Sequence, residues 1–404
     1  MADREFMQRA LEQAKYAKDN HGKVGAVIVA DGEIISSAGS SSDSHAEHAA
    51  LSHLGWVDNP PTEAKATMYV TVQPCQRRSK PNNRTCTSLL ESSGIVGVVY
   101  AAADPQFSQQ EGERALRKRG IQVTQIPDQD LRERALQYFR QDLDVVCIGS
   151  MGIDHINGQI HPGGAVMNTA FALQLLGART GVVTTAGQGE DSKQYVDALT
   201  EAGIDVSCIE YEPNYTLPQA YIQIRDHDCR MEKVEGKFTF PTTITEKTVQ
   251  YLVRSPSLFL RSTNALAYIK IANCRGMDVY VTLHHTTNFF PEILEFGECI
   301  KAIFGNEEEE LLITPHLPSL KDIPVFITLG KAGSKVHLQG LTKVYPATNV
   351  NEIDPTGAGD AFAAGAVYSL LKGEGDPSVS GNRMGGLAVA HYGARVRHIE
   401  KTLS

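Results

Sequence analysis

A histidine, a glutamate and two cysteines have the types and order that hydrolytic zinc chemistry requires. His45 and Glu47 stand two positions apart, Cys75 follows thirty positions after His45, and ten residues separate Cys75 from Cys86. One imidazole and two thiolates leave the fourth tetrahedral position of a zinc ion open for water, whose pKa the metal lowers toward about 7. We therefore expect His45, Cys75 and Cys86 to be metal ligands. Glu47 is expected to stay off the metal and to act as the catalytic acid and base.

The elements around these residues predict how the side chains are positioned. His45 and Glu47 open a predicted helix, so the imidazole can face the metal while the carboxylate reaches the substrate. Cys75 is expected at the N-terminus of the next helix, where the helix dipole would stabilise its thiolate. Alternating apolar segments predict further strands and helices, including a hairpin with its turn at Asp31-Gly32 and strands over 66–72 and 95–102. The pattern predicts an α/β module, a sheet covered by helices.

Residues 5–140 resemble the pyrimidine deaminase domain of riboflavin biosynthesis, a member of the cytidine deaminase-like superfamily. The similarity runs through VGAVIVADGEIISSAG, HAEHAAL, the Pro74-Cys75 element and GERALRKRGIQV. It implies an α/β/α domain, Zn²⁺ as cofactor and an aminopyrimidine nucleoside or nucleotide as substrate. It also places Asn20 among the substrate-binding residues. Between the two cysteines, a basic segment that includes Arg77 and Arg84 either binds a substrate phosphate or forms a solvated loop.

A second group of residues, DPTGAGDAF over 354–362, has the composition of a phosphate-binding turn. Its glycines can direct successive backbone N–H groups toward one point at the start of a helix, which creates an anion hole for a transferring phosphate. Asp360 is then placed to accept the proton of an attacking hydroxyl, and we expect it to be catalytic. The expected cofactor-binding residues of this turn are Thr356, Gly357, Ala358 and Gly359.

The DPTGAGD segment resembles the signature of the PfkB (ribokinase) family of carbohydrate and nucleoside kinases, and the similarity covers residues 143–404. It implies ATP and Mg²⁺ as cofactors and a ribokinase-like α/β domain with a small β lid. The implied substrate-binding residues, in the segments GSMGID and HPGGAVMN, are Asp154, Gly163, Gly164 and Asn168. The implied nucleotide-side residues, in the segment ITLGKAG, are Thr328, Gly330 and Gly333.

One motif of this family has an altered counterpart. The N-x-x-E motif, which organises the magnesium shell, aligns with residues 314–319, where His316 and Ser319 replace asparagine and glutamate. Either Mg²⁺ is held mainly by ATP phosphates and water, or the kinase is slow or lost. The nearby acidic run EEEE over 307–310 is interpreted as a solvated helix end.

Length and composition limit the remaining possibilities. A chain of 404 residues with 42% hydrophobic and 21% charged residues predicts two globular domains, and we place them at 1–142 and 143–404. The first 142 residues hold 17 basic and 18 acidic side chains, so a nucleic-acid partner is disfavoured. Seven cysteines argue against a disulfide framework. We expect a cytoplasmic homodimer that does not insert into membranes and that takes small substrates and ATP.

The two resemblances together imply a bifunctional enzyme of nucleoside or pyrimidine metabolism. One half would deaminate an aminopyrimidine nucleoside or nucleotide by zinc-dependent hydrolysis, and the other would phosphorylate a ribose-type hydroxyl with ATP. Two alternatives stay open. The kinase-like half could be a non-catalytic ligand-sensing or dimerisation domain, or the chain could be an RNA-editing deaminase with an accessory domain.

Overall fold

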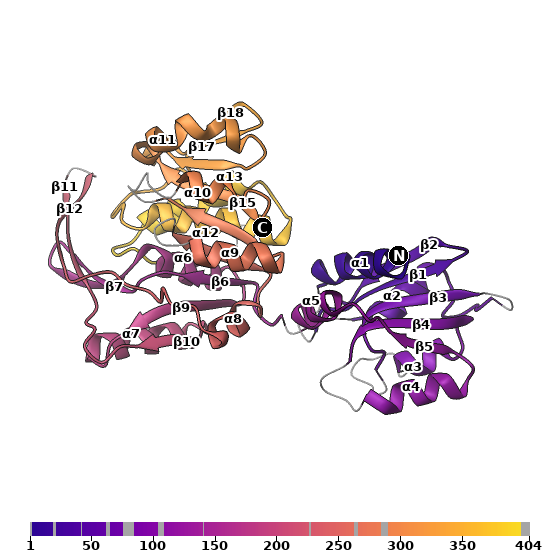
Figure 1. Ribbon diagram of the computed structural model, residues 1–404. Helices are drawn as coiled ribbons and strands as arrows, with labels where there is room; N and C mark the ends of the chain where they lie inside the picture. Colours follow the sequence, from indigo (N-terminus) through magenta and orange to yellow (C-terminus); the bar gives the residue numbers. More distant parts are fainter. Residues whose placement is uncertain are drawn as a thin grey trace. The chain divides into compact units, whose positions relative to one another are not determined.

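The chain folds into two compact units, residues 1–142 and 143–404 (Figure 1). The computed structural model describes residues 2–18, 22–41, 43–61, 65–75, 85–103, 109–139, 141–225, 228–261, 266–283 and 290–396. Within these ranges, no helix has both the length and the apolar character needed to cross a bilayer. The units are considered separately below.

The first unit is one sheet with helices on both faces (Figure 1). Its strand order is β2-β1-β3-β4-β5, with the bounds β1 Gly25–Ala30, β2 Glu33–Gly39, β3 Ala66–Val72, β4 Ile95–Ala102 and β5 Gln122–Gln125. The helices are α1 Ala2–Lys15, α2 Ala46–His53, α3 Cys86–Leu90, α4 Gln109–Lys118 and α5 Gln129–Phe139. Strand β1 is antiparallel to β2 and β3, whereas β3, β4 and β5 run parallel.

Alternation along β1 builds the two cores of this unit. Ile28 packs with residues of α2, α3 and α4, while its neighbour Val27 packs with residues of α1 and α5. Successive strand side chains point to opposite faces, so a fully apolar strand must be covered on both. At the β1–β2 turn, Asp31 and Gly32 have φ of 52° and 82°, which is the left-handed conformation that the Asp-Gly pair predicts. The expected α/β/α arrangement is confirmed.

The second unit is built on a nine-stranded sheet, ordered β10-β9-β6-β13-β14-β15-β16-β17-β18. Its strands are β6 Val145–Ile148, β9 Thr180–Ala186, β10 Asp205–Tyr211, β13 Ser257–Arg261, β14 Asp278–Thr282, β15 Ile300–Asn306, β16 Val325–Thr328, β17 Ser334–Leu338 and β18 Leu341–Tyr345. All neighbours from β10 to β16 are parallel, and β17 and β18 are added antiparallel. The carboxyl ends of the parallel strands therefore share one edge.

Helices cover both faces of this larger sheet. The helices are α6 Ala165–Leu175, α7 Glu190–Glu201, α8 Glu246–Leu252, α9 Leu266–Arg275, α10 Phe290–Leu294, α11 Glu307–Ile313, α12 Ala358–Lys372 and α13 Pro377–Val389, with 3-10 segments η2 Thr314–Leu320 and η3 Gly330–Ala332. One buried core combines residues of α6, α7, α12 and α13, and the other combines residues of α8, α9, α10 and α11.

A separate four-stranded sheet, ordered β12-β11-β7-β8, also belongs to the second unit (Figure 1). Its bounds are β7 Gly152–Ile156, β8 Gln159–Gly163, β11 Gln219–Arg225 and β12 Asp228–Glu235. Strand β7 follows the carboxyl end of β6 after three residues, and β8 leads directly into α6. The β7–β8 hairpin of this sheet therefore carries two residues expected to bind substrate, Asp154 in β7 and Gly163 at the end of β8.

Close packing of α1 on β1 generates a stability prediction. A Cβ atom added to Gly25 would lie 2.0 Å from the carbonyl oxygen of Ala10 and 2.5 Å from the amide nitrogen of Ala14. Backbone atoms cannot rotate away, so we expect Gly25→Ala to lower the free energy of unfolding of this unit by about 3 kcal/mol. The single tryptophan, Trp56, packs against the core of the first unit, and its fluorescence during urea unfolding follows that unit.

Gly97→Ala in β4 is the matched control for this measurement. The three atoms nearest to a Cβ atom there all belong to the side chain of Thr67, the closest at 3.0 Å, and that side chain can adjust. We expect a change below about 1 kcal/mol. Equal losses for Gly25→Ala and Gly97→Ala would contradict the packing described for α1.

Candidate functional sites

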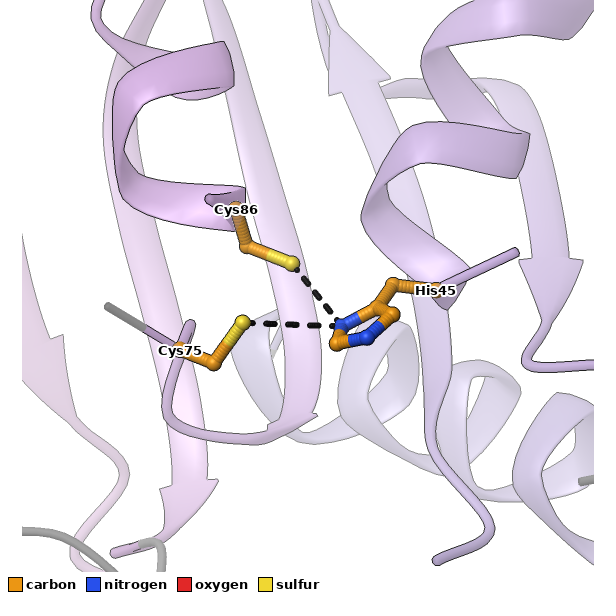
Figure 2. A group of neighbouring side chains, drawn as sticks. All are labelled: His45, Cys75 and Cys86. Carbon is orange, nitrogen blue, oxygen red and sulfur yellow. Dashed lines mark hydrogen bonds between the residues drawn. The ribbon is translucent and has the colours of Figure 1, made fainter. Parts of the chain in front are cut away.

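Three side chains from different parts of the first unit meet at the end of its sheet. His45 is the N-cap residue of α2, Cys75 follows the end of β3, and Cys86 is the first residue of α3. The Nδ1 atom of His45 lies 3.2 Å from Sγ of Cys86 and 3.6 Å from Sγ of Cys75, and all three ligand atoms lie within 4.8 Å of one another. Figure 2 shows both sulfur atoms pointing toward Nδ1.

The distances between these ligand atoms fit one tetrahedral metal ion. Zinc bonds of about 2.3 Å to sulfur and about 2.0 Å to nitrogen put neighbouring ligand atoms about 3.5 Å apart. Two thiols and one imidazole are also the donors that zinc prefers, and a fourth position is left for water. The three residues that the sequence predicts as metal ligands therefore lie in contact in the structure. Their donor atoms fit zinc.

The local structure around the cysteines differs from the sequence expectation in one respect. The helix begins at Cys86, with Thr85 as its N-cap, and not at Cys75. Instead, the carbonyl oxygen of Cys75 accepts hydrogen bonds from the amide and the hydroxyl of Thr87, at 3.2 and 3.1 Å. A hydrogen bond from the Cys86 thiol, aided by His45, lowers the pKa of Cys75 to about 4. Its fellow ligands thus favour the thiolate form of Cys75.

Glu47 lies in the first turn of α2 and is almost fully withdrawn from water. Only 3% of its surface is exposed, and burial, followed by the nearby Cys75, raises its pKa. A carboxyl group with a raised pKa is suited to moving protons to and from a substrate near neutral pH. The predicted pocket residues Asn20, Arg77 and Arg84 lie outside the described residues.

In the second unit, the start of α12 contacts α6 through the predicted catalytic aspartate. The side-chain amide of Asn168 donates to Oδ2 of Asp360 at 2.9 Å, and the hydroxyl of Thr169 donates to the Asp360 carbonyl at 3.2 Å. Burial raises the pKa of Asp360 to about 7, although the bond from Asn168 opposes the shift. Asp360 can therefore exchange a proton near neutral pH.

The turn before α12 has the geometry expected of an anion hole. Gly357 is the N-cap of α12 at a φ of 77°, and a Cβ atom there would lie 2.3 Å from the Ala394 carbonyl oxygen. Asp354 fixes the turn by accepting bonds from the amides of Thr356 and Gly393, both at 2.8 Å. A Cβ atom on Gly359 would meet no described atom within 4 Å. Helix α12 begins at Ala358, so its first amides have no partner within the helix.

The predicted acceptor-side residues also lie together. A Cβ atom on Gly163 would lie 2.2 Å from Oδ1 of Asp154, and one on Gly164, at a φ of 100°, would lie 2.4 Å from the Ser150 carbonyl oxygen. Only glycine allows these approaches. Burial raises the pKa of Asp154 to about 6. The Asn168 side chain that contacts Asp360 lies four residues after Gly164 in α6, which joins the acceptor side to the catalytic aspartate.

On the nucleotide side, Thr328 ends β16 beside the last residue of β15. Its hydroxyl donates to the Gly305 carbonyl oxygen at 3.4 Å. Gly330 and Gly333 follow in and after η3 with φ of 53° and 100°, and a Cβ atom on Gly333 would lie 2.1 Å from the Tyr345 carbonyl oxygen. These residues therefore form a tight turn at the edge where the parallel strands end.

Besides residues 314–319, the structure offers a second candidate for the N-x-x-E motif, Asn306 to Glu309. Asn306 ends β15, and Glu309 lies in the first turn of α11, only 7% exposed. The Asn306 side chain accepts a bond from the Glu309 amide at 2.9 Å, and the Glu309 carboxylate accepts one from the Asn306 amide at 3.0 Å. The negative charge of Glu309 helps to raise the pKa of Asp360.

Asn306 and Glu309 thus lie at the edge of the sheet where the parallel strands end. His316 and Ser319 lie in η2, the segment that returns to the start of β16. The acidic run 307–310 opens a helix as expected, but Glu309 within it is buried. An asparagine directly after an apolar run, with glutamate three positions later, is a helix-capping pattern. That pattern could have located the motif.

Sequence reasoning also missed Arg261, the last residue of β13. Its guanidinium group is buried, which lowers its pKa, while the charges of Asp360 and Glu309 oppose that shift. Its Nε atom has no hydrogen-bond partner among the described residues. A cation at this edge, between two acids, is placed to stabilise negative charge on a transferring phosphate.

Comparisons with known proteins give a match for each of the two units. Residues 144–401 match the model of the pfkB family carbohydrate kinases, and residues 1–102 match that of the cytidine and deoxycytidylate deaminase zinc-binding region. A putative sugar kinase of Pyrococcus horikoshii is 24% identical over 238 residues, covering 53% of this chain and 75% of that protein. A cytidine kinase of Thermococcus kodakarensis is 27% identical over 262 residues, covering 57% and 90%.

Solved structures share the fold of the larger unit. The crystal structure of adenosine kinase from Sinorhizobium meliloti superposes with a TM-score of 0.53 at 18% identity, covering 63% of this chain and 95% of that chain. The two matched regions fit a bifunctional enzyme. The chain belongs to the pfkB family of carbohydrate kinases and carries a cytidine and deoxycytidylate deaminase zinc-binding domain at its N-terminus.

Proposed function

We propose that the first unit, residues 1–142, hydrolytically deaminates an aminopyrimidine nucleoside or nucleotide. The observation that carries this proposal is the meeting of His45, Cys75 and Cys86 near the buried side chain of Glu47. A zinc ion held there would supply hydroxide at neutral pH. Glu47 would take one proton from the attacking water and deliver it to the ring nitrogen. It would then carry the second proton, from the hydroxyl of the adduct, to the amino group, which leaves as ammonia when the C–N bond breaks.

We also propose that the second unit, residues 143–404, transfers the γ-phosphoryl group of ATP to a ribose-type hydroxyl. Asp360 accepts the proton of that hydroxyl, and the first amides of α12 stabilise the charge on the transferred group. Asp154 and Asn168 bind the acceptor, whereas Thr328, Gly330 and Gly333 border the nucleotide. Asn306 and Glu309 would organise Mg²⁺ through its water shell, which removes the reason for interpreting this unit as non-catalytic.

The two proposed reactions act on different parts of one kind of molecule. Deamination alters a pyrimidine base, and phosphorylation alters the ribose attached to such a base. A ribosylated aminopyrimidine would offer both groups. We therefore infer that the two units catalyse consecutive steps on one substrate class, and ammonia and ADP should be measured separately to test each unit.

Replacing Glu47 by glutamine should abolish deamination without loss of the metal. The variant keeps the shape of the side chain but cannot carry the proton, so we expect ammonia release to fall at least about 100-fold. Zinc content, measured by elemental analysis, should stay equal to that of the wild-type protein. Glu91→Gln is the control, because Glu91 forms a surface ion pair with Arg119 at 3.7 Å. Unchanged ammonia release in Glu47→Gln would refute the proposed role.

Replacing Asp360 by asparagine should stop phosphoryl transfer while deamination continues. The amide cannot accept the hydroxyl proton, so ADP formation that depends on acceptor should fall by about 100-fold or more. Ammonia release should be unaffected, since it depends on the other unit. Asp191→Asn, which changes an exposed aspartate in the first turn of α7, is the control. Acceptor-dependent ADP formation that survives Asp360→Asn would rule out this catalytic base.

The pH dependence of the kinase reaction should follow the ionisation of Asp360. The carboxyl must be deprotonated to act as a base, and burial raises its pKa to about 7. We therefore expect kcat/KM for the acceptor to rise about tenfold per pH unit below that value and to level off above it. The profile should be measured by ADP release in Glu47→Gln protein, which removes the deamination reaction. A profile that is flat from pH 5.5 to 8 would contradict this assignment.

A further inference from the structure

Arg395 brings a second buried guanidinium group to the acceptor side of the second unit, and the proposed mechanism does not use it. Its Cζ atom lies 3.5 Å from the centre of the Phe171 ring and 4.7 Å from the centre of the Tyr195 ring. Phe171 belongs to α6, three residues after Asn168, and Tyr195 belongs to α7. Stacking on aromatic rings fixes the plane of a guanidinium group and limits the entropy it loses when it binds a ligand.

The neighbours of Arg395 connect it to the residues expected to bind the acceptor. The Tyr195 hydroxyl donates to the Gly163 carbonyl oxygen at 2.5 Å, and the Tyr195 ring is the one that lies 4.7 Å from the Arg395 guanidinium group. The charges of Arg395 and Asp154 attract each other, and each acts on the pKa of the other. Ala394, the preceding residue, lies against Gly357 of the anion-hole turn.

Two nitrogen atoms of Arg395 lack an acceptor in the part of the chain that the structure describes. The Nε and Nη2 atoms are buried and have no hydrogen-bond partner among the described residues. These two nitrogens lie on the same edge of the planar guanidinium group, and that edge matches two oxygens of a phosphate. Burying charged donors without partners is costly, so such an edge is maintained where a ligand supplies the missing acceptors.

We propose that the phosphoryl acceptor is itself a phosphate ester of a ribosyl compound, and that Arg395 binds its phosphate side-on through Nε and Nη2. This assignment rests on the kinase function proposed above. Asp154 binds hydroxyls of the sugar, and Asp360 takes the proton of the attacked hydroxyl. That oxygen forms a bond to the γ-phosphorus of ATP while the bond to ADP breaks, so the product carries two phosphates. Arg261, beside Asp360 and Glu309, serves the transferred group and not the resident phosphate.

Binding measurements on the full-length protein test this assignment independently of turnover. Titration calorimetry with a non-hydrolysable ATP analogue and Mg²⁺ compares D-ribose, D-ribose 1-phosphate and D-ribose 5-phosphate. We expect one of the two phosphates to bind at least tenfold more tightly than ribose. Arg395→Met should reduce this preference by about 10- to 100-fold, because two charge-assisted bonds are lost. Arg395→Lys should restore part of it, since it returns the charge without the paired edge.

Arg254→Met is the matched control, because Arg254 also stacks on a tyrosine, Tyr251, but is paired with Asp205 at 2.8 Å. The Arg254→Met protein should prefer the ribose phosphate over ribose as strongly as the wild-type protein does. Equal binding of ribose and both phosphates, no binding of either phosphate, or a full preference in Arg395→Met would each overturn the assignment. If binding depends on Arg395 while no acceptor yields ADP, the kinase proposal fails and the phosphate site stands.

Discussion

A carboxyl group at the start of a helix, almost fully buried for Glu47 and half-buried for Asp360, is the feature on which both sites depend. Glu47 lies in the first turn of α2 and Asp360 in the first turn of α12. Burial is the largest cause of the raised pKa in each. A carboxylate in water would be too weak a base, whereas a desolvated one can exchange protons near neutral pH. Each unit supplies a nearby cation or metal site that keeps such burial tolerable.

The folds of the two units explain why these groups stay fixed. In the first unit, α2 and α3 are held by a core they share with β1, β3 and β4, so the metal ligands approach from packed elements. In the second unit, the parallel strands end at one edge, where Arg261, Asn306 and Thr328 are the last residues of their strands. Parallel sheets characteristically bind ligands at this edge. The glycines at 163, 164 and 357 then allow backbone and carboxylate to approach closely.

Motifs whose chemistry is local could be predicted from the sequence, and features made by tertiary contact could not. The metal ligands, the anion-hole turn and the Asp-Gly hairpin each follow from residue types at fixed spacing. Among the described residues, Cys86 starts a helix and Cys75 lies outside any helix, a local difference that the spacing of the two cysteines does not reveal. Asn306 and Glu309 were missed because the acidic run 307–310, which follows Asn306 and contains Glu309, was interpreted as a solvated helix end. Arg261 and Arg395 gave no signal, because only the folded chain shows that their charges are buried.

The most direct measurement of the central claim is the ionisation of Asp360 itself. Protein labelled with ¹³C at the aspartate carboxyl carbons can be titrated by NMR, and the signal absent from Asp360→Asn protein identifies this group. The account predicts a midpoint near the value of about 7 that burial produces. A midpoint near 4, the ordinary value for aspartate in water, would show that the carboxyl is solvated and would contradict the account.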